Sequence, residues 1–128
     1  MIILLDTSTP TCKLSLVDGD ERHDVQWQAD RELAKGLLGF LDTQLRGVDR
    51  TWTDISGIGV FQGPGSFTGL RIGMTVLNTM ADTLVVPIVA AQGEEWQASA
   101  LARLQAGEND HLALHFYGGE ANITKPRK

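Results

Sequence analysis

The chain has 128 residues, which is the size of one domain and leaves little room for a second hydrophobic core. Hydrophobic residues make up 42% and charged residues 21%, a balance typical of a globular protein and not of a low-complexity chain. The formal net charge of −5 excludes a strongly basic surface of the kind that binds nucleic acid on its own.

The sequence predicts a protein of a reducing compartment without a membrane anchor. Cys12 is the one cysteine, so no disulfide can form within the chain, and its strand-like surroundings favour a small buried apolar residue. The apolar residues 1–5 are too few for a signal peptide or a membrane span. We therefore expect a cytoplasmic protein that has no contact with a membrane.

Three antiparallel strands are predicted at the start of the chain. Residues 2–5 form a continuous apolar run that ends at Asp6, which is typical of a central strand covered on both faces. Residues 12–17 alternate between apolar and polar side chains, and the turn signal Asp18-Gly19-Asp20 leads into a third strand over residues 23–28.

Helical spacing follows the strands. Leu33, Leu37, Leu41 and Leu45 recur every four residues, which predicts an amphipathic helix from Asp30, the expected N-cap, to about Arg46. We expect strands over 55–61 and 84–89 and helices over 66–83 and 94–104. The order β-β-β-α-β-α-β-α indicates an α/β fold, a single actin-like (ribonuclease-H-like) lobe over residues 1–107. Residues 108–128 are expected to be a C-terminal extension, with a further strand over 111–117.

One glycine-rich segment, residues 63–73, joins a predicted strand to a predicted helix. Gly63 and Gly65 flank Pro64 in a tight turn, and Ser66 stands where the helix N-cap belongs. Free N–H groups at such a helix start can hold an anion, but no lysine follows, so this is not a Walker A loop. The residues of the candidate anion site are Asp6, Thr7, Gly63 and Gly65; an ordinary structural turn is the alternative.

Gly65, Gly69 and Gly73 follow at four-residue spacing and leave one side of the second helix bare. Each interior glycine costs the helix roughly 0.5–1 kcal/mol relative to alanine, which indicates a close neighbour on that side. The neighbour is either a partner helix or the protein's own sheet. On the first interpretation, the predicted docking surface consists of Leu33, Leu37, Leu41, Gly65, Ser66, Gly69, Leu70, Gly73, Met74 and Leu77.

The remaining motifs carry little chemistry. Asp6-Thr7-Ser8-Thr9 follows the first strand, where actin-like ATPases carry an acidic residue that approaches metal and phosphate. The same residues also make an ordinary Asx turn. His111 and His115 are spaced like metal ligands on a helix, yet the segment between them is strand-like and a third ligand is not evident. We expect no catalytic residues, no metal and no cofactor.

The quoted motifs resemble those of the TsaB family, also called YeaZ. Asp6-Thr7-Ser8-Thr9 after an apolar first strand resembles the family's opening, and residues 63–73 closely resemble its most recognisable motif; the likeness runs from Met1 to about Leu104. It implies a non-catalytic scaffold whose two-helix face pairs with the catalytic paralogue TsaD, with TsaE joining as an ATPase. TsaD transfers a threonylcarbamoyl group to the adenosine beside the tRNA anticodon, giving N6-threonylcarbamoyladenosine (t6A). The scaffold would meet tRNA only indirectly.

Two departures from the family pattern keep other functions open. The chain stops where the family's second lobe would begin, and its first helix reads Arg31-Glu32-Leu33-Ala34, without the histidine common there. One alternative is a small single-lobe ATP-binding or hydrolytic enzyme that uses Asp6 and the Gly63 turn. Another is a stand-alone homodimeric interaction module that uses the same two helices.

Overall fold

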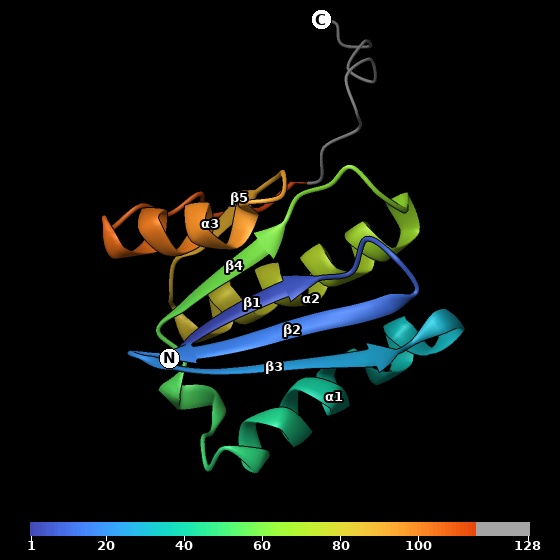
Figure 1. The fold of residues 1–128 in the computed structure, drawn as a ribbon, viewed down its shortest axis with the longest axis horizontal. Coiled ribbons are helices and arrows are strands. Elements are labelled where there is room, and N and C mark those ends of the chain that lie inside the picture. The colour runs from blue at the N-terminus through green and yellow to red at the C-terminus, as the bar shows by residue number, and fades with distance from the viewer. Residues whose placement is uncertain (115–128) are drawn as a thin grey trace, which may run out of the picture.

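A five-stranded sheet with helices on both faces makes up the part of the chain that the structure, a computed structural model, describes, residues 1–114 (Figure 1). The strands are β1 (Ile2–Asp6), β2 (Thr11–Asp18), β3 (Glu21–Gln28), β4 (Gly57–Phe61) and β5 (Ile88–Ala91). The helices are α1 (Leu33–Gly47), α2 (Phe67–Leu84) and α3 (Trp96–Gln105), with 3-10 turns η1 (Asp30–Glu32) and η2 (Trp52–Asp54).

The strand order is β3-β2-β1-β4-β5. β1 pairs antiparallel with β2, and β2 with β3, whereas β1–β4 and β4–β5 are parallel. This arrangement confirms the predicted element order and the predicted fold class, an α/β lobe of the actin-like, ribonuclease-H-like type. The hairpin between β2 and β3 turns at Gly19, whose φ of 63° lies in the left-handed region that glycine adopts without strain.

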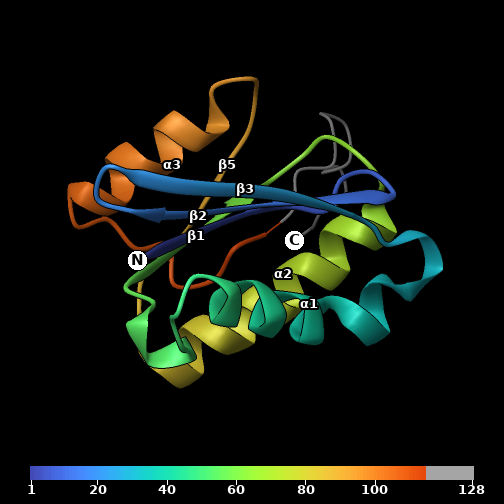
Figure 2. The same ribbon diagram turned by 60° about the horizontal axis from the view of Figure 1, so that its bottom comes forward.

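α1 and α2 cover one face of the sheet, and α3 covers the other over β4 and β5 (Figure 2). Because side chains alternate along a strand, Ile3 and Leu5 of β1 pack on the α1/α2 side, and Leu4 packs on the α3 side against Ala100. All of these side chains are fully buried. Burying an aliphatic side chain of this size contributes about 1.5–3 kcal/mol, so the two-sided core dominates the stability of the lobe.

The first helix begins differently from the prediction. Asp30 is not its N-cap: Asp30 has a φ of 48°, its Oδ1 accepts a hydrogen bond from Gln28 Nε2 at 2.9 Å, and it opens the 3-10 turn that precedes α1. The predicted strand over 84–89 also begins later, because α2 continues to Leu84 and the left-handed residue Val85 ends it. Ser66 is the N-cap of α2 as predicted, since its Oγ accepts from the N–H of Gly69 at 3.4 Å.

The chain after α3 does not form the predicted strand where the structure describes it. Residues 111–114 have no strand conformation; Ala113 instead exchanges two hydrogen bonds with the Asn78 side chain of α2. The rest of that predicted strand, and with it His115, lies outside the described residues. Among residues 1–114, none of the helices combines the length and the apolar character that a bilayer span requires.

Candidate functional site

The turn after β1 is held by hydrogen bonds within the protein. Asp6 Oδ1 accepts from the backbone N–H of Ser8 at 2.8 Å and from its hydroxyl at 2.6 Å, which is an Asx turn. The Thr7 hydroxyl donates to the carbonyl oxygen of Gly69 at 2.7 Å, and the N–H of Ser66 donates to the carbonyl oxygen of Ser8 at 2.9 Å. Asp6 Oδ1 and the Thr7 hydroxyl, two side-chain groups of the candidate anion site, are therefore used internally, which favours the structural turn.

The glycine stripe of α2 faces this same turn. A Cβ at Gly65 would lie 2.5 Å from the Cβ of Ser8, one at Gly69 would lie 2.2 Å from the carbonyl oxygen of Thr7, and one at Gly73 would lie 2.3 Å from the Thr7 hydroxyl. The prediction that these glycines leave a bare side for a partner helix is wrong. Their close neighbour is the turn after β1 in the same chain, which corresponds to the alternative that the sequence left open, a neighbour within the protein itself.

The apolar residues of the predicted docking surface are also placed inside the lobe. Their exposed fractions are at most 6%, and they lie between the sheet and the two helices: Leu33, Leu37, Leu41, Leu70, Met74 and Leu77. An amphipathic helix on a sheet buries its main apolar stripe, so side chains of that stripe are not available to a partner. The structure thus places these six side chains in the core of the lobe, and their role as contact residues stays a prediction; both helices keep an outward face as well.

An apolar groove lies on that outward face, between α1 and α2 and beside η2. It has a volume of about 390 Å³. Its lining is formed by Leu38, Trp52, Thr75, Val76, Thr79, Met80, Thr83 and Leu84. Leu38 is 53% exposed, which leaves its side chain open to solvent at the groove. The lining carries no charged side chain, so the groove can hold apolar groups of a partner without burying an unpaired charge.

A second depression continues the groove toward the start of α2. It shares Thr75 and Val76 with the first and extends it past Ala34, Thr68 and Ile72 to Arg71. The two together form a seam along the paired helices, which we call the α1/α2 seam. The seam escaped prediction because the docking residues of the first helix were taken from the four-residue leucine stripe, and Leu38 lies one position beside that stripe. The signal available in the sequence was that an apolar residue such as Leu38 falls on the outward side of the predicted helix.

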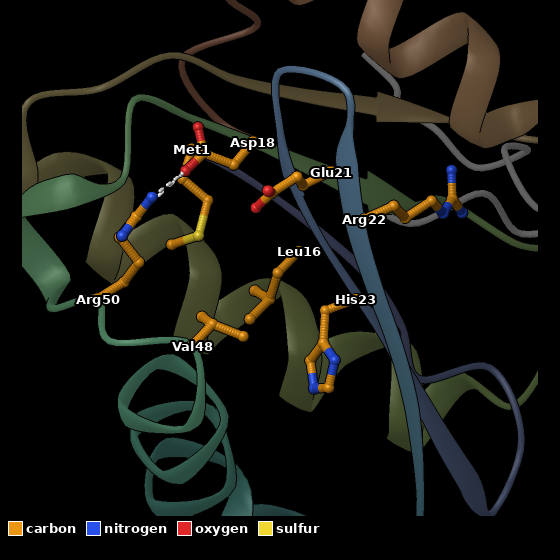
Figure 3. Close-up of a pocket in the computed structure, with 8 residues that line it drawn as sticks. All are labelled: Met1, Leu16, Asp18, Glu21, Arg22, His23, Val48 and Arg50. Atoms are coloured by element: carbon orange, nitrogen blue, oxygen red, sulfur yellow. Dashed lines mark hydrogen bonds and ion pairs between the residues drawn. The ribbon is translucent and has the colours of Figure 1, made fainter.

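A further pocket, of about 370 Å³, lies at the β2–β3 hairpin (Figure 3). Its floor is apolar, formed by Met1, Leu16 and Val48, and its rim is charged. Arg50 Nη2 lies 2.6 Å from Asp18 Oδ2, and the hydrogen bond from Arg50 lowers the pKa of Asp18 below its ordinary value. Of the other polar residues of the lining, Arg22 pairs with Asp24 outside the pocket at 2.9 Å, and His23 Nε2 lies 3.4 Å from Gln44 Oε1.

The described residues also lack the groups that catalysis on a metal or a thiol would need. Within residues 1–114, Cys, His, Asp and Glu side chains do not gather in threes or more as a metal site requires. Cys12 is fully buried in β2, and burial, with a smaller effect of Asp6, raises the pKa of its thiol to about 12. The thiol stays protonated at neutral pH and is a poor nucleophile.

Comparison with known proteins agrees with this architecture. Residues 27–125 match the family model described as TsaD: tRNA N6-adenosine threonylcarbamoyltransferase. The chain is 44% identical over 100 residues to the tRNA threonylcarbamoyladenosine biosynthesis protein TsaB of Bacillus subtilis, covering 77% of this chain and 43% of the relative. Its identity to the TsaB protein of Haemophilus influenzae is 28% over 113 residues, covering 88% of this chain and 48% of the relative.

A solved structure, YeaZ from Pseudomonas aeruginosa, superimposes with a TM-score of 0.69 at 28% identity, covering 82% of this chain and 49% of that one. The fold and the matched segment define one lobe of an actin-like protein, and the chain spans about half the length of the relatives that it matches. Within that class, the chain belongs to the TsaB (YeaZ) family.

Proposed function

We propose that this chain is a non-catalytic scaffold lobe that binds and supports a TsaD-like catalytic subunit during formation of t6A in tRNA. The α1/α2 seam is the surface through which it docks. The single observation that carries this proposal is the uncharged groove between the two helices, with Leu38 more than half exposed at its edge. Large exposed apolar groups at a groove mark binding sites for apolar side chains of a partner.

The docking surface uses the outward residues of the same two helices that the sequence indicated. Leu38 on α1 and Val76 and Thr79 on α2 form the walls of the groove. A partner helix laid along the seam would place apolar side chains at helical spacing into it, the mode in which an amphipathic helix binds a groove. Trp52 and Met80 extend the apolar area under such a helix.

The alternative of a small ATP-binding or hydrolytic enzyme finds less support. Asp6 and the Thr7 hydroxyl, the groups that would approach metal and phosphate, already bond to Ser8 and Gly69. These contacts favour a scaffold that leaves the chemistry to its partner.

The remaining partners follow from the same role. A TsaE-like ATPase joins the complex of this chain with the catalytic subunit, in the cytoplasm. A homodimer would use the same seam and would compete with the catalytic subunit for it. With a net charge of −5, the chain itself contributes little to the attraction of tRNA phosphates, so tRNA is met through the partner.

The experiment that tests this function is co-purification of the affinity-tagged chain from its native cells. A TsaD-like protein retained in stoichiometric amount supports the proposal. Recovery of the chain alone, or as a homodimer that excludes such a protein, contradicts it.

A further inference from the structure

β5 is an edge strand whose outer side is fully satisfied by hydrogen bonds that do not come from another strand. In a parallel pair, alternate residues direct both backbone groups to the same side, and here Ile88 and Ala90 direct theirs away from β4. The Ile88 N–H donates to Asn109 Oδ1 at 3.1 Å, and the Ile88 carbonyl accepts from the Asp110 N–H at 2.8 Å. The Ala90 N–H donates to Asp110 Oδ2 at 2.8 Å, and the Ala90 carbonyl accepts from Arg103 Nη1 at 2.9 Å.

The three residues that seal this edge are themselves fixed in place. Arg103 on α3 pairs with the Asp110 carboxylate and also, at 2.7 Å, with Glu108. Beyond Asp110, Ala113 is tied to α2 by its two hydrogen bonds with the Asn78 side chain, of 2.8 and 3.0 Å. Residues 109–113 therefore lie along β5 as a strap that is anchored at both ends.

The opposite edge of the sheet, β3, is protected by its own side chains. β3 carries four consecutive exposed residues with charged or titratable side chains, residues 21–24, and charges along an edge discourage the addition of another strand. β5 has the sequence Ile88-Val89-Ala90-Ala91, in which every residue is buried and none is charged. Nothing in the β5 side chains themselves would repel an added strand.

We propose that Arg103, Asn109 and Asp110 form an edge guard on β5, and that its release opens β5 to antiparallel strand addition by the β5 of a second copy of this chain. In two copies related by a twofold axis, the backbone N–H and carbonyl groups of Ile88 and Ala90 would bond to those of the other copy in place of the guard residues. The partner is a second copy because the freed edge is short and uncharged, and each of its two outward residues, Ile88 and Ala90, offers one donor and one acceptor that a twofold axis pairs with those of the other copy. This inference is independent of the docking role of the α1/α2 seam, which lies on the other side of the lobe from α3.

The test compares Asp110→Ala with Asp42→Ala by amide hydrogen exchange and light scattering over a range of concentrations. Asp42 is the matched control, because it is also a partly exposed carboxylate paired with an arginine, Arg46, but lies on α1, which covers the opposite face of the sheet from α3. In dilute Asp110→Ala we expect the Ala90 amide to exchange about tenfold faster, the factor for loss of an ordinary hydrogen bond. At high concentration the mass should double and the Ala90 amide should regain protection, while Asp42→Ala behaves like the parent chain.

A folded Asp110→Ala variant that stays at the parent's mass at every concentration, or whose Ala90 amide exchanges no faster than the parent's, would overturn the proposal. So would association that leaves the Ala90 amide unprotected, since the contact would then lie elsewhere. Should Asp110→Ala unfold, Asn109→Ala keeps the pair of Arg103 with Asp110 and removes Asn109 Oδ1, which accepts from the N–H groups of Ile88 and His111. Faster exchange at Ile88 in a folded Asn109→Ala variant supports the guard, whereas unfolding of both variants shows that residues 109–113 belong to the core instead.

Discussion

Thr7 and Gly73 lie so close that a Cβ on the glycine would be 2.3 Å from the threonine hydroxyl. The same hydroxyl donates its hydrogen bond to the carbonyl oxygen of Gly69, one turn earlier on α2. Thr7, in the turn after β1, thus packs directly against the backbone of α2. Its exposed fraction is 2% as a result. The glycines of the most recognisable motif in the sequence serve this internal contact.

Replacing Gly69 by alanine should destabilise the lobe in spite of the better helix propensity of alanine. The new Cβ would meet the carbonyl oxygen of Thr7, a backbone atom that no rotamer change can move aside. We expect a loss of about 1–3 kcal/mol in unfolding free energy, measured by urea denaturation. Gly39→Ala is the control: nothing lies within 4 Å of its Cβ position on α1, so this variant should gain about 0.5–1 kcal/mol. Equal changes in unfolding free energy for Gly69→Ala and Gly39→Ala would show that the contact with Thr7 does not determine the cost of a side chain at position 69.

Gly73→Ala should also destabilise the lobe, but a second substitution should rescue it. The obstacle at this position is the Thr7 side chain, which Thr7→Ala removes, whereas the obstacle at Gly69 is backbone. A double-mutant cycle in urea should therefore give a coupling energy of about 0.5–3 kcal/mol between positions 7 and 73. Additive effects of the two substitutions would contradict the direct contact.

The order of strands and helices could be predicted from periodicity, because apolar runs and four-residue leucine spacing report local burial. The buried leucines also illustrate where such reasoning stops. Leu37 and Leu38 are adjacent and chemically identical, yet one is 0% and the other 53% exposed; the leucine stripe indicates which of them is buried, but not that the other lines a groove with α2. The contact between Thr7 and Gly73 is likewise a relation between segments distant in sequence. Spacing indicated a close neighbour for the glycines without identifying it.

The thiol of Cys12 should resist alkylation in the folded protein. Burial raises its pKa to about 12, so less than a thousandth of it is thiolate at pH 7.5, and β2 shields it from reagents. Iodoacetamide labelling followed by mass spectrometry should show one modified cysteine in urea and almost none under native conditions. Fast stoichiometric labelling of the native chain would show that β2 opens readily.

The edge guard should weaken in acid. Burial opposes ionisation of Asp110, but hydrogen bonds from Arg103 and the Ala90 N–H, with His111 nearby, hold its pKa below the ordinary value; Glu108 also faces Arg103. A carboxyl whose folded pKa is depressed stabilises the fold above its unfolded pKa of about 4 and loses that contribution as the pH falls further. Unfolding free energy should therefore fall less steeply from pH 5 to pH 3 in Asp110→Asn than in the parent chain. Identical slopes would mean that Asp110 is not held ionised by these contacts.

Nucleotide should not bind at the turn after β1. Calorimetry with ATP and Mg²⁺ is expected to give no heat above dilution, since Asp6 and Thr7 are engaged within the protein. Neither ATP hydrolysis nor peptidase activity is expected from the isolated chain. Turnover that disappears in Asp6→Ala would restore the enzyme alternative.

The measurement that tests docking most directly is the affinity of the chain for its TsaD-like partner with Leu38→Glu. A carboxylate at this 53% exposed position places a charge in the uncharged groove and should cost little stability, about 1 kcal/mol or less. Leu112→Glu is the control, because Leu112 is 57% exposed and does not line the groove. We predict that Leu38→Glu weakens binding by about tenfold or more while Leu112→Glu binds like the parent chain. A folded Leu38→Glu variant that binds the partner with unchanged affinity would contradict docking through the α1/α2 seam.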